Sequence, residues 1–154
     1  MNQVLKTYNK ITKYPFGKKI FSYMVSRKAP YFKTIRPQIK ELRPNFIEVS
    51  MQKRKAIHNH IQTVHAIAMC NICEYAMGIC AEVSIPKHRR WIPMGMEVAY
   101  LKKATTNLTA TCDLSNEDWN ESEVPCFVSV KNTDGIEVMT ATITLKVTDK
   151  PVKK

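Results

Sequence analysis

The sequence is short of several features that define whole classes of proteins. No apolar run is long enough to span a membrane, and the basic beginning of the chain lacks the apolar segment and small residues of a signal peptide. Glycine is scarce, with four residues in 154, and no glycine-rich phosphate loop is formed. Zinc-finger spacings, aromatic RNA-binding motifs and internal repeats are also missing. We therefore expect a soluble chain with no membrane span and no specific nucleic-acid partner.

Cysteine is present but forms no framework of the kind that secreted domains use. Five cysteines occur, and Cys70, Cys73 and Cys80 lie together in one apolar segment. Reduced thiols in such a setting behave as small hydrophobic side chains. A reducing compartment is expected for that reason, and a cytoplasmic location is the simplest one.

Acidic residues are few: 13 aspartates and glutamates stand against 24 lysines and arginines, which gives a net charge of +11. A nucleic acid, an anionic membrane surface or a phosphate-bearing ligand could each account for this excess. A basic surface without any specific partner could account for it equally. Because the basic residues are scattered along the chain, charge alone leaves the partner open.

The length and the hydrophobic fraction of 44% predict one folded domain with its own core. We expect a loosely held basic arm over residues 1–15, a single domain over residues 16–148 and a disordered tail over residues 149–154. Inside the domain, Phe16–Arg27 repeats apolar residues at helical spacing, and Pro30 ends that helix.

Extended segments make up much of the remainder. Residues 85–96 contain two prolines and a glycine and are expected to form a loop or an irregular lead into a strand. Asn132–Gly135 is a hairpin signal. Apolar and strand-forming residues predict strands in six segments: 32–42, 46–55, 97–103, 107–114, 125–131 and 136–147. This order of elements predicts an α+β domain in which an antiparallel sheet wraps around a long central helix.

The chain is organised around that central helix. From Ala66 to Ala81 apolar residues point in every direction, which is typical of a buried helix. One carboxylate, Glu74, interrupts the apolar surface and shares a stripe with Asn71 and Gly78. Ionised carboxylates are rarely buried without a partner. Glu74 is therefore either the functional group of this helix or a rim residue that pairs with a lysine from a neighbouring strand.

Asn59, His65 and Glu74 form the pattern N-x5-H-A-x7-E. With the order of elements, this pattern resembles the hotdog-fold thioesterase superfamily. It is most similar to the phenylacetyl-CoA thioesterase type, in which Asn, a His-Gly-Gly turn and a helix Asp or Glu have the same spacing. The segment HNHIQTVHAIAMCNICEYAMG looks closer still to an uncharacterised hotdog family related to those enzymes. The resemblance covers roughly Phe16–Thr148 and implies a hotdog fold.

The resemblance also implies hydrolysis of an acyl-CoA thioester. Glu74 would be the general base or the nucleophile, and burial would raise its pKa towards neutrality. Asn59 would orient the water or the thioester carbonyl. Backbone N–H groups at the start of the helix, near His65 and Ala66, would polarise the thioester oxygen. The family's two glycines are replaced here by Ala66 and Ile67, which keep their N–H groups but do not easily adopt a positive φ. The β-branched Ile67 would also narrow the space near the thioester.

Binding of the substrate is expected to use the positive charge. Arginine and lysine match phosphate well, and the candidates for contacts to the CoA phosphates are Lys87, Arg89, Arg90, Lys102 and Lys103. The substrate would be a thioester of CoA or of acyl carrier protein, with no cofactor, and the chain would form a homodimer or a homotetramer. The alternative is a non-enzymatic protein of the same fold that binds acyl-CoA or acyl chains.

Two other chemistries are not favoured. His58, His60 and His65 lie near Cys70 and Cys73 in the sequence, but no second pair completes a zinc site at a usual spacing, so no metal is expected. Cys73 as a nucleophile would need an exposed thiol with a lowered pKa, and an apolar helix interior provides the opposite.

Overall fold

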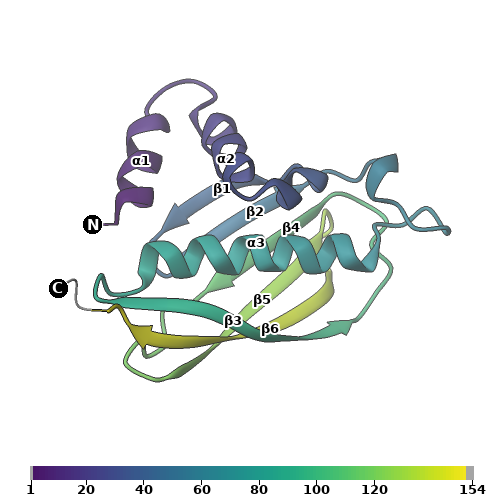
Figure 1. Cartoon of the computed structure of the whole chain (residues 1–154). Helices are drawn as coiled ribbons and strands as arrows, with labels where there is room; N and C mark the ends of the chain where they lie inside the picture. Colours follow the sequence, from purple (N-terminus) through teal and green to yellow (C-terminus); the bar gives the residue numbers. More distant parts are fainter. Residues whose placement is uncertain (1, 152–154) are drawn as a thin grey trace.

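The computed structural model describes residues 2–151 and has one six-stranded antiparallel sheet packed against a long helix (Figure 1). The order of strands across the sheet is β1-β2-β4-β5-β6-β3. The strands are β1 (Gln38–Arg43), β2 (Phe46–Met51), β3 (Arg89–Tyr100), β4 (Leu108–Asp113), β5 (Glu123–Asn132) and β6 (Glu137–Asp149). The helices are α1 (Gln3–Ile11), α2 (Gly17–Lys28) and α3 (Ala66–Ser84), with short 3-10 turns η1 (Pro30–Thr34) and η2 (Lys55–Ile57).

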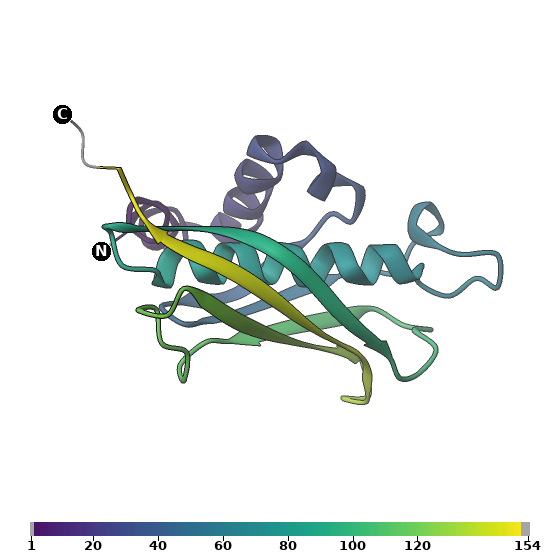
Figure 2. The same cartoon turned by 60° about the horizontal axis from the view of Figure 1, so that its bottom comes forward.

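The core lies between α3 and the inner face of the sheet. Alternate residues of β2, β4, β5 and β6 are buried, as a strand with one covered face requires. Ile72, Ala76 and Cys80 of α3 are fully buried against them. Figure 2 shows α3 running along the sheet while the strands curl around it. The predicted α+β arrangement, with an antiparallel sheet around a long central helix, is confirmed.

The edge strand β3 differs from the sequence-based expectation. Residues 85–96 were predicted to be irregular, but β3 begins at Arg89 and pairs with β6 along its whole length. The prolines and glycine are accommodated because β3 pairs on one side only and its register shifts between Pro93 and Gly95. The hairpin at Asn132–Gly135 is present as predicted, with Gly135 at a φ of 76°.

The N-terminal segment also differs from the expected basic arm over residues 1–15. It forms α1, whose first turn is capped by the Asn2 side chain accepting a hydrogen bond from the Val4 N–H at 2.7 Å. Leu5 and Tyr8 are buried, and the Tyr8 ring packs edge-on against Phe21 of α2 with centroids 5.1 Å apart. The N-terminal segment folds in spite of its basic composition because α2 provides an apolar surface on which α1 packs.

The predicted tail over residues 149–154 is only partly testable. Asp149 is the last residue of β6 rather than part of a tail, and its neighbour Lys150 donates a backbone hydrogen bond to the carbonyl of His88 at 2.8 Å. Residues 152–154 lie outside the described part of the chain.

By length and composition, α3 is the one helix among residues 2–151 that could cross a membrane, so the expectation that no apolar run is long enough does not hold for α3. More than half of the relevant window, 56%, is buried inside the fold. A core helix of a soluble protein has this property, because it is apolar on the sides that its own sheet covers. The length and composition of α3 are therefore explained by its packing on the sheet.

Gly17 fixes the turn between α1 and α2, and its replacement is predicted to destabilise the fold. A Cβ atom at Gly17 would lie 2.1 Å from the Ile11 carbonyl oxygen, so Gly17→Ala should lower the free energy of unfolding by about 3 kcal/mol. Gly95→Ala is the matched control, because nothing lies within 4 Å of its Cβ position. Urea denaturation measures both, and equal stability of the two variants would contradict this account of the turn.

Thiol reactivity should report the packing of α3. Cys73, Cys80, Cys112 and Cys126 are fully buried, and burial raises the pKa of Cys73 and of Cys126 to about 12. Only Cys70 is partly exposed. We expect at most one thiol per chain, that of Cys70, to react with a disulfide reagent in native protein and all five to react in denaturant. The Cys70→Ser variant should lose the fast phase, and rapid labelling of a second thiol would show that the core is open.

Candidate functional site

The N-terminus of α3 is held by His65, which is its N-cap residue. The His65 Nδ1 accepts a hydrogen bond from the Ile67 N–H at 3.1 Å, and the His65 N–H donates to the Ile57 carbonyl at 2.8 Å. The Ala66 N–H has no acceptor among the described residues and lies at the positive end of the helix dipole. A carbonyl oxygen that gains negative charge could be stabilised there.

Asn59 braces the loop that leads into α3. Its Oδ1 accepts from the N–H groups of Thr63 at 3.0 Å and Ile61 at 3.2 Å, and its Nδ2 donates to the Thr63 hydroxyl at 2.8 Å. The loop is further tied by the Val64 N–H, which donates to the Ala104 carbonyl at 2.9 Å. Asn59 therefore positions the turn before the helix and keeps one amide hydrogen for a ligand.

Glu74 is exposed in the single chain. The expected burial of its carboxylate is therefore wrong for the isolated subunit. The physical reason is that α3 packs on the sheet with one side and leaves a stripe of the opposite side open. This stripe is formed by Ile67, Cys70, Glu74, Gly78 and Glu82, none of which is buried. Glu74 has no ion pair with a lysine or arginine among residues 2–151, so the alternative of a paired rim residue is not what the single chain shows.

Tyr100 is a residue that sequence reasoning did not single out. The end of β3 places its hydroxyl 3.4 Å from the Cys70 Sγ, one helical turn from Glu74. The contact with Cys70 and burial raise the pKa of Tyr100 to about 12, so the phenol remains a hydrogen-bond donor at neutral pH. A strand residue that reaches the helix only through sheet curvature gives no local sequence signal.

A small cavity of about 190 Å³ opens beside the first turns of α3, with His65 and Asn71 in its wall. Asn71 is 5% exposed, and its Nδ2 donates to the Thr34 hydroxyl at 3.0 Å while its Oδ1 has no partner in the described structure. The Nε2 of His58, which also lines the cavity, is likewise buried and unpaired among the described residues. These two polar atoms make the cavity suited to a polar group or to bound water.

The five basic residues predicted to contact the CoA phosphates lie in two groups, one near each end of β3. Arg89 is mainly structural: its guanidinium donates to the carbonyls of Asn120 at 2.7 Å and Val147 at 3.3 Å. Lys87 and Arg90 lie near the C-terminal end of α3, and the Arg90 Nε donates to the Thr148 hydroxyl at 3.1 Å. Lys102 and Lys103 follow the far end of β3 and are exposed beside the loop that precedes α3.

Neither a metal-binding cluster nor a reactive Cys73 thiol is present among residues 2–151. No three His, Cys, Asp or Glu side chains lie close enough together within residues 2–151 to hold a metal ion. The Cys73 thiol, with its pKa raised to about 12 by burial, stays protonated and is a poor nucleophile.

Solved structures share this fold. The crystal structure of genomics APC5556 is 42% identical, with a TM-score of 0.84, over 96% of this chain and 97% of that chain. A thioesterase family protein from Silicibacter pomeroyi is 17% identical, with a TM-score of 0.71, over 88% and 100% of the two chains. A probable thioesterase of unknown function from Pseudomonas aeruginosa, PA5026, is 14% identical, with a TM-score of 0.74, over 89% and 97%.

At such low identity the two thioesterase-like neighbours show the fold alone, and the fold is the hotdog fold of thioesterase-like proteins. No curated protein sequence matches the chain. A family model described as a domain of unknown function matches residues 17–147, which include every strand except the last two residues of β6. The chain therefore belongs to the DUF4442 family, and its own fold is the hotdog thioesterase-like fold.

Proposed function

We propose that the protein hydrolyses acyl thioesters of CoA or acyl carrier protein in a site shared between two subunits. The observation that carries the proposal is the open stripe of α3, where Glu74 is exposed beside an edge strand that lacks a partner on one side. An exposed carboxylate in the middle of a largely apolar helix of a hotdog fold is suited to activate water or to attack the carbonyl itself.

The edge strand β3 supports assembly. It pairs only with β6, and its exposed side chains include Ile92, Met94, Val98 and Tyr100. An unpaired, apolar edge is a site for pairing with another chain, and a two-fold axis is the commonest closed symmetry. Antiparallel pairing of two β3 strands about their middle would continue the sheet and cover the stripe that carries Glu74. A homodimer is the minimal form, and two such dimers would give a tetramer.

The length of α3 supports a composite site. His65 and Glu74 are nine residues apart, which is about 13 Å along a helix that rises about 1.5 Å per residue. A carbonyl held at the Ala66 N–H is therefore out of reach of Glu74 in the same subunit. With the two α3 helices facing each other across the axis, Glu74 of the partner subunit would act on it.

In this site each residue has one role. The Ala66 N–H stabilises the carbonyl oxygen as water attacks and the carbon–sulfur bond breaks. Glu74 of the partner subunit takes the proton from the water and returns it to the leaving thiolate, or attacks the carbonyl directly. Asn59 holds the turn, and its free amide hydrogen orients the water or the carbonyl.

The CoA phosphates would meet charge from both chains. Lys102 and Lys103 lie on the subunit that provides Ala66, at the end of β3 that carries Tyr100. Pairing about the middle of β3 sets Tyr100 of one chain opposite Arg90 of the other, and Lys87 lies beyond it. The contacts of Arg89 to backbone carbonyls leave it the least available of the five basic residues.

A second function is favoured by one feature of the turn. The Ile67 N–H is engaged by His65, and Ala66 and Ile67 stand where the thioesterases of the resembling type have glycines. The protein would then bind acyl-CoA or acyl chains without turning them over. A panel of acyl-CoAs that includes phenylacetyl-CoA, assayed for release of free thiol, separates the two functions and defines the acyl group.

Replacement of Glu74 tests the role of the carboxylate. Glu74→Gln keeps the shape and removes the basicity, so thioester hydrolysis should fall by roughly two to four orders of magnitude. Because Glu74 has no ion-pair partner among the described residues, the substitution strands no opposite charge, and the free energy of unfolding should not fall by more than about 0.5 kcal/mol. Glu121→Gln, in an exposed loop away from α3, is the control. A Glu74→Gln protein that melts normally and keeps full hydrolysis would remove Glu74 from the mechanism.

Mixed dimers test whether the site is shared. Ala66→Pro removes the N–H at the first helical position, where proline is tolerated and where the extended backbone of His65 accepts a following proline. Each single variant should be inactive. Random reassociation of Ala66→Pro with Glu74→Gln chains should restore about a quarter of wild-type activity, because half of the dimers are mixed and each has one intact site.

Light scattering of each sample confirms that the chains are at least dimeric. If both groups act from the same subunit, the mixture stays inactive and the shared site is wrong, even if hydrolysis by the wild type stands.

A further inference from the structure

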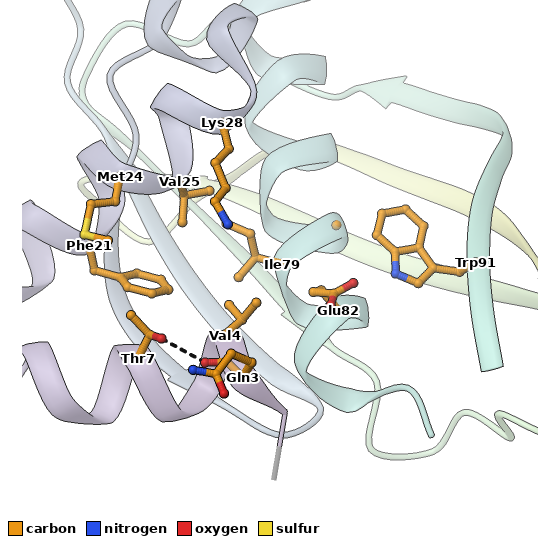
Figure 3. Close-up of a pocket in the computed structure, with 11 residues that line it drawn as sticks. Gln3, Val4, Thr7, Phe21, Met24, Val25, Lys28, Ile79, Glu82 and Trp91 are labelled. Carbon is orange, nitrogen blue, oxygen red and sulfur yellow. Dashed lines mark hydrogen bonds between the residues drawn. The ribbon is translucent and has the colours of Figure 1, made fainter. Parts of the chain in front are cut away.

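Two cavities meet where α1 and α2 cover the C-terminal half of α3, away from the helix N-terminus. The first has a volume of about 290 Å³ and is lined mainly by apolar side chains (Figure 3). Val4 of α1 and Phe21 and Val25 of α2 face Ile79 of α3 across it, and Trp91 of β3 closes the far side. Two of the three helices in this wall, α1 and α2, carry no residue of the proposed catalytic centre, and the third is the C-terminal half of α3.

The second cavity, of about 540 Å³, adjoins the first and is strongly basic. The two share Gln3, Glu82 and Trp91 as lining residues, so they form one amphipathic hollow, which we call the paired cavity. Five cations line the second cavity against the single carboxylate of Glu82: Lys6, Lys87, Arg89, Arg90 and Lys150. An anion is favoured at this end of the paired cavity.

Much of this charge is available to a ligand. The ammonium groups of Lys6 and Lys87 form no ion pair or hydrogen bond within the described residues, and Arg90 uses only its Nε. The carboxylate of Glu82 is held by Asn2, whose Nδ2 donates to the Glu82 carbonyl at 2.7 Å and to its Oε1 at 3.3 Å. The two lysines are therefore free to meet an anion without first breaking a contact.

We propose that the paired cavity binds one single-chain anionic amphiphile, with its aliphatic chain between α1, α2 and α3 and its anionic head over Lys6 and Lys87. An apolar hollow alone would accept many ligands, and a cationic hollow alone would accept any phosphate or carboxylate. A ligand that satisfies both must have a linear apolar part joined to an anion, as a fatty acid does. This binding goes beyond hydrolysis and does not require it.

Gly78 connects the paired cavity with the open stripe. It lines the apolar cavity one helical turn from Glu74, and a Cβ atom there would lie 3.4 Å from the Trp91 ring. The absence of a side chain leaves room along α3 between the carboxylate and the cavity. The same aliphatic chain could thus come from the acyl part of a bound thioester or from a free fatty acid.

Binding is tested on the full-length protein with cis-parinaric acid, a fluorescent long-chain fatty acid, displaced by saturated fatty acids of increasing length. The displacement constant should tighten by roughly tenfold for each added pair of methylene groups until the cavity is full. CoA without an acyl chain and inorganic phosphate should displace the probe weakly. Displacement that ignores chain length would overturn the proposal.

Two pairs of variants locate the ligand. Val25→Trp fills the apolar cavity and should weaken probe binding at least about tenfold, whereas Tyr23→Trp on the exposed side of α2 should not. Lys6→Glu with Lys87→Glu should weaken it by about tenfold at low salt, whereas Lys10→Glu on α1 should not. A thermal melt accompanies each variant, and Val4→Phe replaces Val25→Trp if that protein does not fold. Unchanged binding in both cavity-filling variants would overturn the proposal.

The acyl-length dependence of thioester hydrolysis shows whether the aliphatic chain in the cavity belongs to a thioester or to a free fatty acid. A shift of the acyl-length optimum to shorter chains in Val25→Trp assigns the cavity to the thioester's own acyl chain. An unchanged optimum with lost fatty-acid binding assigns it to free acid. Absence of hydrolysis in the wild type, with fatty-acid binding intact, would remove the proposed activity and leave this site standing. If the wild type binds no fatty acid and the cavity variants change the oligomeric state, the paired cavity is an interface with a second copy of the chain. That result would overturn the proposal.

Discussion

The packing of α3 on the curled sheet is the contact on which the rest of the structure depends. Ile72, Ala76 and Cys80 are excluded from water there, and burial of apolar surface is the main source of stability for such a domain. The same contact sets the direction in which every other residue of α3 points. Although α3 is apolar on nearly all sides, only one of its sides packs against the sheet.

The side of α3 that the sheet does not cover carries the polar groups of the candidate site. Glu74, Cys70 and Gly78 lie on it, the helix N-terminus lies at one end of it, and α1 and α2 with their cavity cover the other end. The edge strand β3 runs alongside, with no partner on its outer edge. This surface joins a carboxylate, free N–H groups, an open sheet edge and an apolar cavity, and the proposed thioester site rests on that combination.

Local patterns predicted most of the fold. Alternation located β2, β4, β5 and β6 within a few residues, because each has one covered and one open face. The start of β3 was missed because Pro93 and Gly95 are signals against a strand, and only an edge position with a shifted register makes them compatible with one. The α1 helix was missed because its apolar residues are buried against α2. The composition of residues 1–15 alone gives no sign of that contact.

The sequence by itself determined most of the strands, the central helix that begins next to His65 and the position of Glu74 within its apolar stretch, because spacing and propensity act over a few residues. Only the tertiary structure decided which stripe of α3 is covered, and therefore that Glu74 is exposed rather than buried. It also decided that Arg89 is used by backbone carbonyls and that Tyr100 meets Cys70. These outcomes depend on contacts between segments far apart in the chain, where the curvature of the sheet, and not the local pattern, sets which side chains meet.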